Sequence, residues 1–208
     1  MRLGIHGPPG SGKSLIVAWM VKQWHDQGRV ILSLGMDFNP KFIQYRTIEV
    51  NEILHIATTG KPFPEELKPN FRGMVLVGDE FYTLADSRFR DSASTVISYI
   101  IAQTRKRSMY FVHIEPKRKW ADSRIRDLSE KIVLCEKWDR ETDTTCYNDE
   151  CMKPHKFHYN SINMYTGTKK GFWIKKPEEI YPLYDTKQLF GVTTAMNERL
   201  LEKSLSGK

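Results

Sequence analysis

The sequence predicts an α/β fold in which helices flank a central, mostly parallel β-sheet. Three observations predict it. Strand-like and helix-like segments alternate along residues 1–138, a glycine-rich loop joins the first strand to the first helix, and an apolar strand ends in the acidic pair Asp79 and Glu80. Such alternation favours parallel strands, because each helix carries the chain back across the sheet.

The first two elements lie on either side of the glycine-rich loop. Arg2–His6 is a short segment that enters the loop and is predicted to be a strand. After Lys13, apolar residues recur at spacings of one, three and four until Gly28, which suits a helix C-terminus because glycine tolerates positive φ. These residues are Leu15, Ile16, Trp19, Met20 and Trp24.

The other core elements follow in order along the chain. Apolar runs predict strands at 30–34, 74–78, 109–114 and 132–135. Helical spacing predicts a short helix at 47–59 and a clearer amphipathic helix at 92–104. The side chains expected to point inward from these two helices are Ile53, Leu54, Ala57, Ala93, Val96, Ile97, Ile100 and Ile101.

The C-terminal third has a different pattern of residues. Aromatic residues alternate with polar ones after Glu136, which favours an antiparallel hairpin added at a sheet edge, and 196–205 is predicted to be a terminal helix. We therefore expect a single domain over 1–208, with its core in 1–138 and the hairpin and last helix in 139–208.

Composition narrows the class of protein. The chain has 208 residues and 40% hydrophobic content, typical of a globular domain. No apolar run approaches the roughly 18 residues of a membrane span. The first strand begins directly after Met1, so no signal or transit peptide is expected and the cytoplasm is the expected compartment.

Three cysteines do not suggest a disulfide framework. Cys146, Cys151, His155 and His158 can be read as four zinc ligands. The gap between the cysteine pair and the histidine pair is too short for an ordinary zinc finger. Thiols that merely lie near strand histidines are the alternative interpretation.

The net charge of +7 is concentrated in one segment. Residues 105–126 contain eight basic residues and two acidic ones, which accounts for +6 of that total. A local concentration of this kind indicates a polyanionic partner.

The glycine-rich loop matches the Walker A pattern G-x-x-x-x-G-K-[ST] at every position. Glycines let backbone N–H groups turn toward phosphate oxygens, and the N-terminus of the following helix favours an anion. Lysine is expected to reach the β- and γ-phosphates of ATP, and serine to bind Mg²⁺. The nucleotide-binding residues are Gly7, Pro8, Pro9, Gly10, Ser11, Gly12, Lys13 and Ser14.

The acidic pair fits the Walker B position. A carboxylate that ends an apolar strand places Asp79 beside the metal, where it can hold a Mg²⁺-bound water. Glu80 can then activate the attacking water as a general base. The pair predicts ATP hydrolysis, and the absence of an Asn-Lys-x-Asp motif counts against a GTPase.

The order of the motifs resembles the FtsK–HerA superfamily of ring-forming DNA-pumping ATPases. It is most similar to the genome-packaging ATPases of tailless icosahedral viruses, including archaeal turreted ones. The resembling residues are Asp-Glu at 79–80, Asp-Ser-Arg at 86–88, Gln-Thr-Arg-Lys-Arg at 103–107, Asp-Ser-Arg-Ile-Arg at 122–126 and Tyr-Asp-Thr at 184–186.

The resemblance implies a RecA/HerA-like homo-oligomeric ring, a hexamer or pentamer, that packages double-stranded DNA. It implies a location in the host cytoplasm or at a capsid vertex, with vertex proteins as partners. It also implies an arginine finger acting in trans, for which Arg105 is the first choice and Arg88, Arg124 and Arg126 are alternatives. The helix C-terminal dipole gives Arg105 a second, purely structural interpretation.

The sequence departs from the superfamily at the sensor position. The usual Thr-Gln pair is replaced by His113-Ile114-Glu115, so His113 is assigned the sensor role, with a strand-end histidine satisfied by backbone groups as the alternative. Lys117, Arg118 and Lys119, followed by Trp120, are predicted DNA contacts or a solvated basic loop. Residues 180–184 could form a lid over the adenine.

Three other functions remain open on the sequence. A phage extrusion ATPase would usually carry a membrane span. A small-molecule kinase would need an acceptor pocket and a basic lid, and would not normally carry the pair at Asp79 and Glu80. A non-catalytic, nucleotide-gated DNA-binding subunit is the third alternative.

Overall fold

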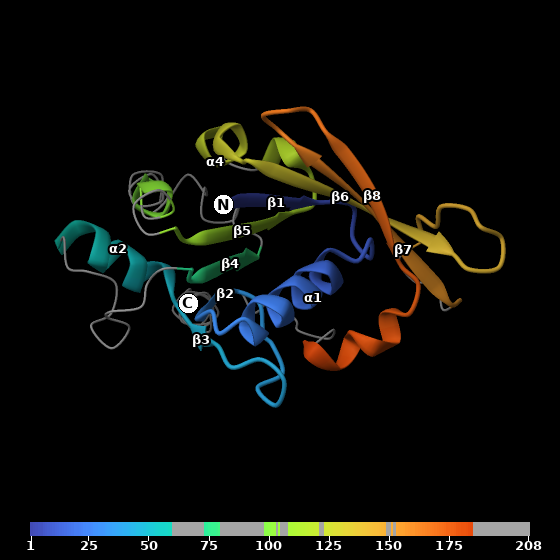
Figure 1. Ribbon diagram of the computed structural model, residues 1–208, viewed down its shortest axis with the longest axis horizontal. Helices are drawn as coiled ribbons and strands as arrows, with labels where there is room; N and C mark the ends of the chain where they lie inside the picture. The colour runs from blue at the N-terminus through green and yellow to red at the C-terminus, as the bar shows by residue number, and fades with distance from the viewer. Residues whose placement is uncertain are drawn as a thin grey trace, which may run out of the picture.

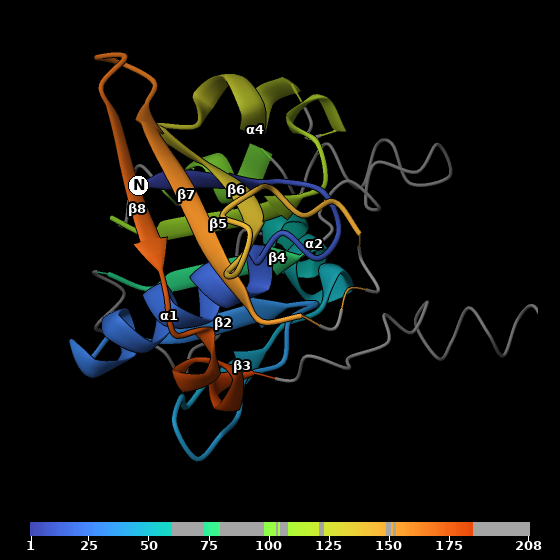
Figure 2. The same ribbon diagram turned by 90° about the vertical axis from the view of Figure 1, so that its right-hand side faces the viewer.

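The computed structural model contains one eight-stranded sheet with helices on both faces (Figures 1 and 2). It describes residues 1–59, 73–79, 98–102, 104, 108–120, 123–148, 151 and 153–184. The strands are β1 (Arg2–His6), β2 (Ile31–Leu34), β3 (Arg46–Thr47), β4 (Val75–Asp79), β5 (Tyr110–Glu115), β6 (Lys131–Asp139), β7 (His155–Asn163) and β8 (Lys169–Ile174). The helices are α1 (Lys13–Asp26), α2 (Val50–Thr59) and α4 (Ser123–Leu128), with single 3-10 turns η4 (Arg118–Trp120), η5 (Pro177–Glu179) and η6 (Tyr181–Leu183).

The strand order is β3-β2-β4-β5-β1-β6-β7-β8. Neighbouring strands from β3 to β6 pair in parallel, whereas β7 pairs antiparallel with both β6 and β8. The predicted fold class is therefore confirmed: a mostly parallel sheet carries an antiparallel hairpin at its C-terminal edge. Strand β5 lies between β1 and β4, so the strand that enters the glycine-rich loop is not adjacent to the strand that ends at Asp79.

Each face of the sheet has its own hydrophobic core. One core joins α1 to alternate residues of the strands, such as Ile5, Val77 and Ile114. The other core contains Ile53 of α2, Ile100 of the helical residues 98–102, and Ile125 of α4. These pack on the strand residues that point to the second face, such as Leu76 and Phe111. Successive residues of a strand face opposite sides, so membership of a core fixes the side toward which each strand residue points.

Two predicted boundaries differ in the structure, each because a strand pairs with its neighbour in the sheet. The helix expected from residue 47 begins at Val50, because Arg46–Thr47 pairs with β2 as a short strand. Strand β6 continues to Asp139 because β7 pairs with it along its whole length.

Trp19, one of the apolar residues whose spacing predicted α1, is 38% exposed, and its ring lies against Phe172 of β8 with centroids 6.3 Å apart. The fully buried residues of α1 are instead Leu15, Ile16, Val17, Ala18 and Val21. Leu15 and Ile16 therefore belong to the core as the apolar spacing suggests, and Met20 and Trp24 pack against it.

Some predicted elements lie partly or wholly outside the described residues. Residues 98–102 and 104 are helical, as expected of the helix at 92–104, and Ile100 is buried, but residues 92–97 are outside. The predicted helix at 196–205 is also outside the described residues. Within the described part, no helix has the length and apolar character needed to cross a membrane.

Candidate phosphate-binding site

The loop between β1 and α1 has the backbone shape that its glycines permit. Gly10 has φ 67° and Gly12 has φ 85°, both in the left-handed region that favours glycine. The amide of Ser11 donates to the carbonyl of Pro8 at 3.2 Å, which closes the turn. Gly12 precedes the first residue of α1 and provides no side-chain cap. The helix N-terminus therefore opens onto the loop with its positive dipole end.

Lys13 lies across this loop. Its ammonium donates to the carbonyl of Gly7 at 2.9 Å and to that of Pro8 at 2.9 Å. Ser14 follows in the first turn of α1 and is partly exposed. The predicted phosphate ligands are thus gathered at one end of the sheet, where the carboxyl ends of the parallel strands meet.

Asp79 lies at the same end and on the same face. It ends β4 two residues after Val77, which belongs to the core shared with α1, so Asp79 also points to the α1 side. In register it pairs with Ile114 of β5, which pairs with Ile5 of β1, the residue two before the loop. This position suits the predicted role of Asp79 near a metal, and that role stays a prediction. Glu80 lies outside the described residues.

Two aromatic residues of β7 support the loop from behind, and the sequence did not reveal them. The hydroxyl of Tyr159 donates to the carbonyl of Gly12 at 3.0 Å. A Cβ added at Gly12 would lie 2.5 Å from Cδ1 of Phe157 and 2.8 Å from the hydroxyl oxygen of Tyr159. Only glycine therefore fits here. The one signal in the sequence was the aromatic alternation that predicted the hairpin.

His113 lies on the other face of the sheet, away from α1. It lies two residues after Phe111, which belongs to the core opposite α1, so both side chains point to that face, and His113 is completely buried. Its Nε2 is 3.1 Å from the hydroxyl of Ser129. Nε2 of the ring is thus satisfied by a side-chain hydroxyl and not by the backbone groups of the alternative interpretation; the sensor role stays a prediction.

His6 forms an edge contact with His113, with ring centroids 5.6 Å apart. Burial, with the neighbouring cations Arg118 and Lys13, lowers the pKa of His6 to about 4. Burial, followed by the proximity of His6, lowers the pKa of His113 to about 3. Both histidines are therefore neutral in the folded protein near neutral pH.

These shifts predict a loss of stability in mild acid. Between pH 6.5 and about 4 the unfolded chain takes up protons on both histidines while the folded chain does not. The free energy of unfolding should therefore fall as pH falls, by up to about 1.4 kcal/mol per pH unit for each histidine. Urea unfolding across this range measures the slope. His6→Asn should give a shallower slope than the wild type; equal slopes would contradict the assignment.

A cavity of about 410 Å³ adjoins the loop. His6, Gly7 and Pro8 form one wall, and Lys117 and Arg118 form another. Lys117, Arg118 and Lys119, the predicted DNA contacts, are all exposed, so the structure brings two of the three next to the phosphate site. Lys117 and Arg118 therefore lie close enough to the loop to contact a bound nucleotide as well, and DNA contact stays a prediction.

The predicted arginine fingers have different positions. Arg105 and Arg88 lie outside the described residues. Arg124 donates to the hydroxyl of Ser98 at 3.3 Å, and Arg126 donates to Asp127 at 3.2 Å. These contacts do not test a role at a subunit interface.

The predicted adenine lid is anchored near α1. The carbonyls of Leu183 and Pro182 accept hydrogen bonds from Asn39, at 2.8 Å to the backbone amide and 3.0 Å to the side chain. Burial is the main cause of a raised pKa for Tyr159, and Tyr184 lies close enough to contribute to it. Leu183 and Tyr184 pack against the core that contains Tyr159, and contact with adenine stays a prediction.

Comparison with known proteins supports the fold. By sequence, no family model and no curated protein matches the chain. In structure it is similar to the genome packaging NTPase B204 from Sulfolobus turreted icosahedral virus 2, solved with ATP-gammaS. The match has a TM-score of 0.51 and 11% identity over 82% of this chain and 95% of the other. It is also similar to the ATPase domain of G40P, with a TM-score of 0.55 and 9% identity over 90% of this chain and 84% of the other. The chain therefore has the fold of P-loop NTPases, and the predicted resemblance is confirmed at the level of the fold.

Proposed function

We propose that the protein is a Mg²⁺-dependent ATPase that drives double-stranded DNA into a viral capsid. One observation carries the proposal. The loop, Lys13 and Asp79 lie together at the carboxyl ends of the parallel strands, on the face of the sheet that α1 covers. Lys13 reaches the β- and γ-phosphates, and the helix N-terminus favours their charge.

The hydroxyl and carboxylate oxygens at the carboxyl ends of these strands suit magnesium. Mg²⁺ prefers oxygen ligands and keeps several waters. The Ser14 hydroxyl would bind the ion directly, and Asp79 would hold one of its waters. When bound, the ion neutralises charge on the phosphates. Glu80, which follows Asp79 directly, takes a proton from the attacking water.

Charge distribution supports DNA as the polymer that is moved. The basic segment at 105–126 carries +6, and its residues Lys117, Arg118 and Lys119 are exposed. The fold likeness to a genome packaging NTPase favours packaging as the purpose. The chain would act as a ring of six or five copies, with Arg105 completing the neighbour's site, in the host cytoplasm or at a capsid vertex against vertex proteins.

The decisive experiment measures ATP hydrolysis with and without double-stranded DNA, alongside the mass of the oligomer. We expect DNA to stimulate turnover at low salt and the stimulation to weaken as salt rises, because phosphate contacts release counterions. Glu80→Gln should bind ATP but turn over at background, which excludes a contaminating ATPase.

The possible failures separate the parts of the proposal. ATP hydrolysis without DNA stimulation at low salt would reject the motor and retain the ATPase. Turnover retained by Glu80→Gln would remove Glu80 from the mechanism. A monomer that is fully active with DNA would reject the ring.

A further inference from the structure

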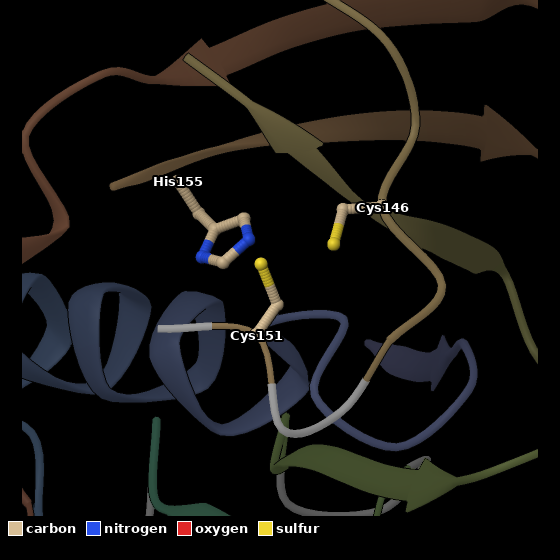
Figure 3. Close-up of side chains that lie close together, drawn as sticks. All are labelled: Cys146, Cys151 and His155. Carbon is tan, nitrogen blue, oxygen red and sulfur yellow. The ribbon is translucent and has the colours of Figure 1, made fainter. Parts of the chain in front are cut away.

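Three potential metal ligands lie together where β6 joins β7. One ligand atom each of Cys146, Cys151 and His155 lies within 4.8 Å of the other two. Figure 3 shows both sulfur atoms and one ring nitrogen of His155 directed into the same small space. This cluster lies outside the phosphate-binding residues themselves.

The backbone around the cluster is fixed by pairing. His155 is the first residue of β7 and is paired with Asp139, the last residue of β6. The amide of Cys146 donates to the carbonyl of Lys137 at 2.8 Å, which holds the returning chain against β6. The amide of Cys151 donates to the carbonyl of Asn148 at 3.3 Å, which turns the chain back toward His155.

The burial and bonding of the three side chains favour a bound metal. All three are partly buried, and both cysteines are unbridged. Nε2 of His155 is buried and has no hydrogen-bond partner in the part of the chain that the structure describes. A buried ring nitrogen without a partner carries a desolvation cost, which a metal bond would remove.

We propose that Cys146, Cys151 and His155 bind a zinc ion. Thiolate and imidazole are the ligands that zinc prefers, and two thiolates neutralise its charge. Ligand atoms on one tetrahedral zinc lie about 3.5–3.8 Å apart, so movements of about 1 Å bring these three atoms to their metal positions. A water molecule or one further side chain completes the four ligands.

His158, which the sequence pattern offered as a fourth ligand, is not part of the cluster. It lies three residues after His155 on the same strand, so the two side chains point to opposite faces of the sheet. Its Nδ1 is 3.1 Å from Glu136, and its ring lies 4.5 Å from that of Trp173. This makes His158 the matched control for His155.

The zinc would stabilise one wall of the cavity beside the phosphate loop. Thr145, Cys146 and Tyr147 line that cavity together with Gly7 and Pro8. The described residues of the connection between β6 and β7 contain only turns and one isolated bridge, between Thr145 and Trp138. A metal that ties both cysteines to the start of β7 holds this connection in place, as structural zinc sites do.

The test is the zinc content of the purified protein after reduction and zinc loading. We expect about one zinc per chain in the wild type and in His158→Gln. Loss to less than a tenth of that is expected in Cys146→Ser, Cys151→Ser and His155→Gln. Titration of the metal-free wild type with Co²⁺ should give thiolate-to-cobalt absorption bands, a readout that requires no variant.

Three outcomes would overturn the proposal. Wild-type protein without zinc and without cobalt bands would exclude the site. Equal zinc content in His155→Gln and the wild type would exclude His155 as a ligand. A disulfide between Cys146 and Cys151 that persists under reducing conditions, detected as one free thiol per unfolded chain instead of three, would assign the pair to a covalent bridge. None of these readouts depends on ATP hydrolysis, so the zinc site and the proposed function fail independently.

Discussion

Lys13→Ala is expected to reduce ATP hydrolysis by about 100-fold or more, since losing one well-placed donor to a developing anion typically costs this much. Lys13 lies across the phosphate loop, with its ammonium 2.9 Å from the carbonyls of both Gly7 and Pro8. The substitution removes the cation that meets the β- and γ-phosphates and the contacts that hold the loop. Steady-state turnover and the affinity for a fluorescent ATP analogue measure the two losses separately.

Lys22→Ala is the matched control. Lys22 lies on the same helix, and its ammonium contacts Asp26 at 2.5 Å in an exposed i,i+4 ion pair. Such pairs contribute about 0.3–0.5 kcal/mol, so turnover should be unchanged. If Lys13→Ala retained turnover within twofold of Lys22→Ala, the loop would not be the site of hydrolysis.

Tyr159→Ala is expected to lower the free energy of unfolding by about 3–5 kcal/mol, the usual cost of truncating a buried aromatic residue. Tyr159 is 0% exposed, and its ring stacks on Phe172 with centroids 5.3 Å apart. Its hydroxyl also holds the carbonyl of Gly12, so the affinity for nucleotide should fall as well. Urea unfolding and nucleotide titration measure the two effects.

Tyr159→Phe separates packing from hydrogen bonding. It keeps the stacked ring and removes only the donor to Gly12, so a loss of about 1 kcal/mol is expected. Tyr165→Ala, at an aromatic residue that is 73% exposed, should change stability by less than about 0.5 kcal/mol. A similar small effect for Tyr159→Ala would show that β7 does not support the loop.

Local features of the site were predictable because they depend on short-range chemistry. Strand Arg2–His6, the start of α1 at Lys13 and the positive φ of Gly28 all agree with the sequence prediction. Apolar runs also located the other core strands to within a few residues. The boundary errors at β3 and β6 occur where pairing with a distant strand, not local pattern, sets the limits.

The surroundings of His113 and His6 were not predictable in this way. His113 occupies the sequence position of a sensor, but its side is set by strand alternation and its partner Ser129 follows α4. The pKa of His6 depends on burial and on cations that only folding brings near. Sequence reasoning could place both residues on strands, but it could not determine which groups surround each side chain in the folded protein.

The sequence by itself determined the phosphate loop, because its conformation requires glycine at fixed local positions and its chemistry requires an adjacent lysine and serine. Only the tertiary structure decided what supports that loop and what gathers beside it. Tyr159 contacts Gly12 across 147 residues of chain. Cys146, Cys151 and His155 meet because β6 and β7 pair in one register, and alternation along β7 points His158 to the other face. Such contacts depend on burial and strand register, which are properties of the whole sheet.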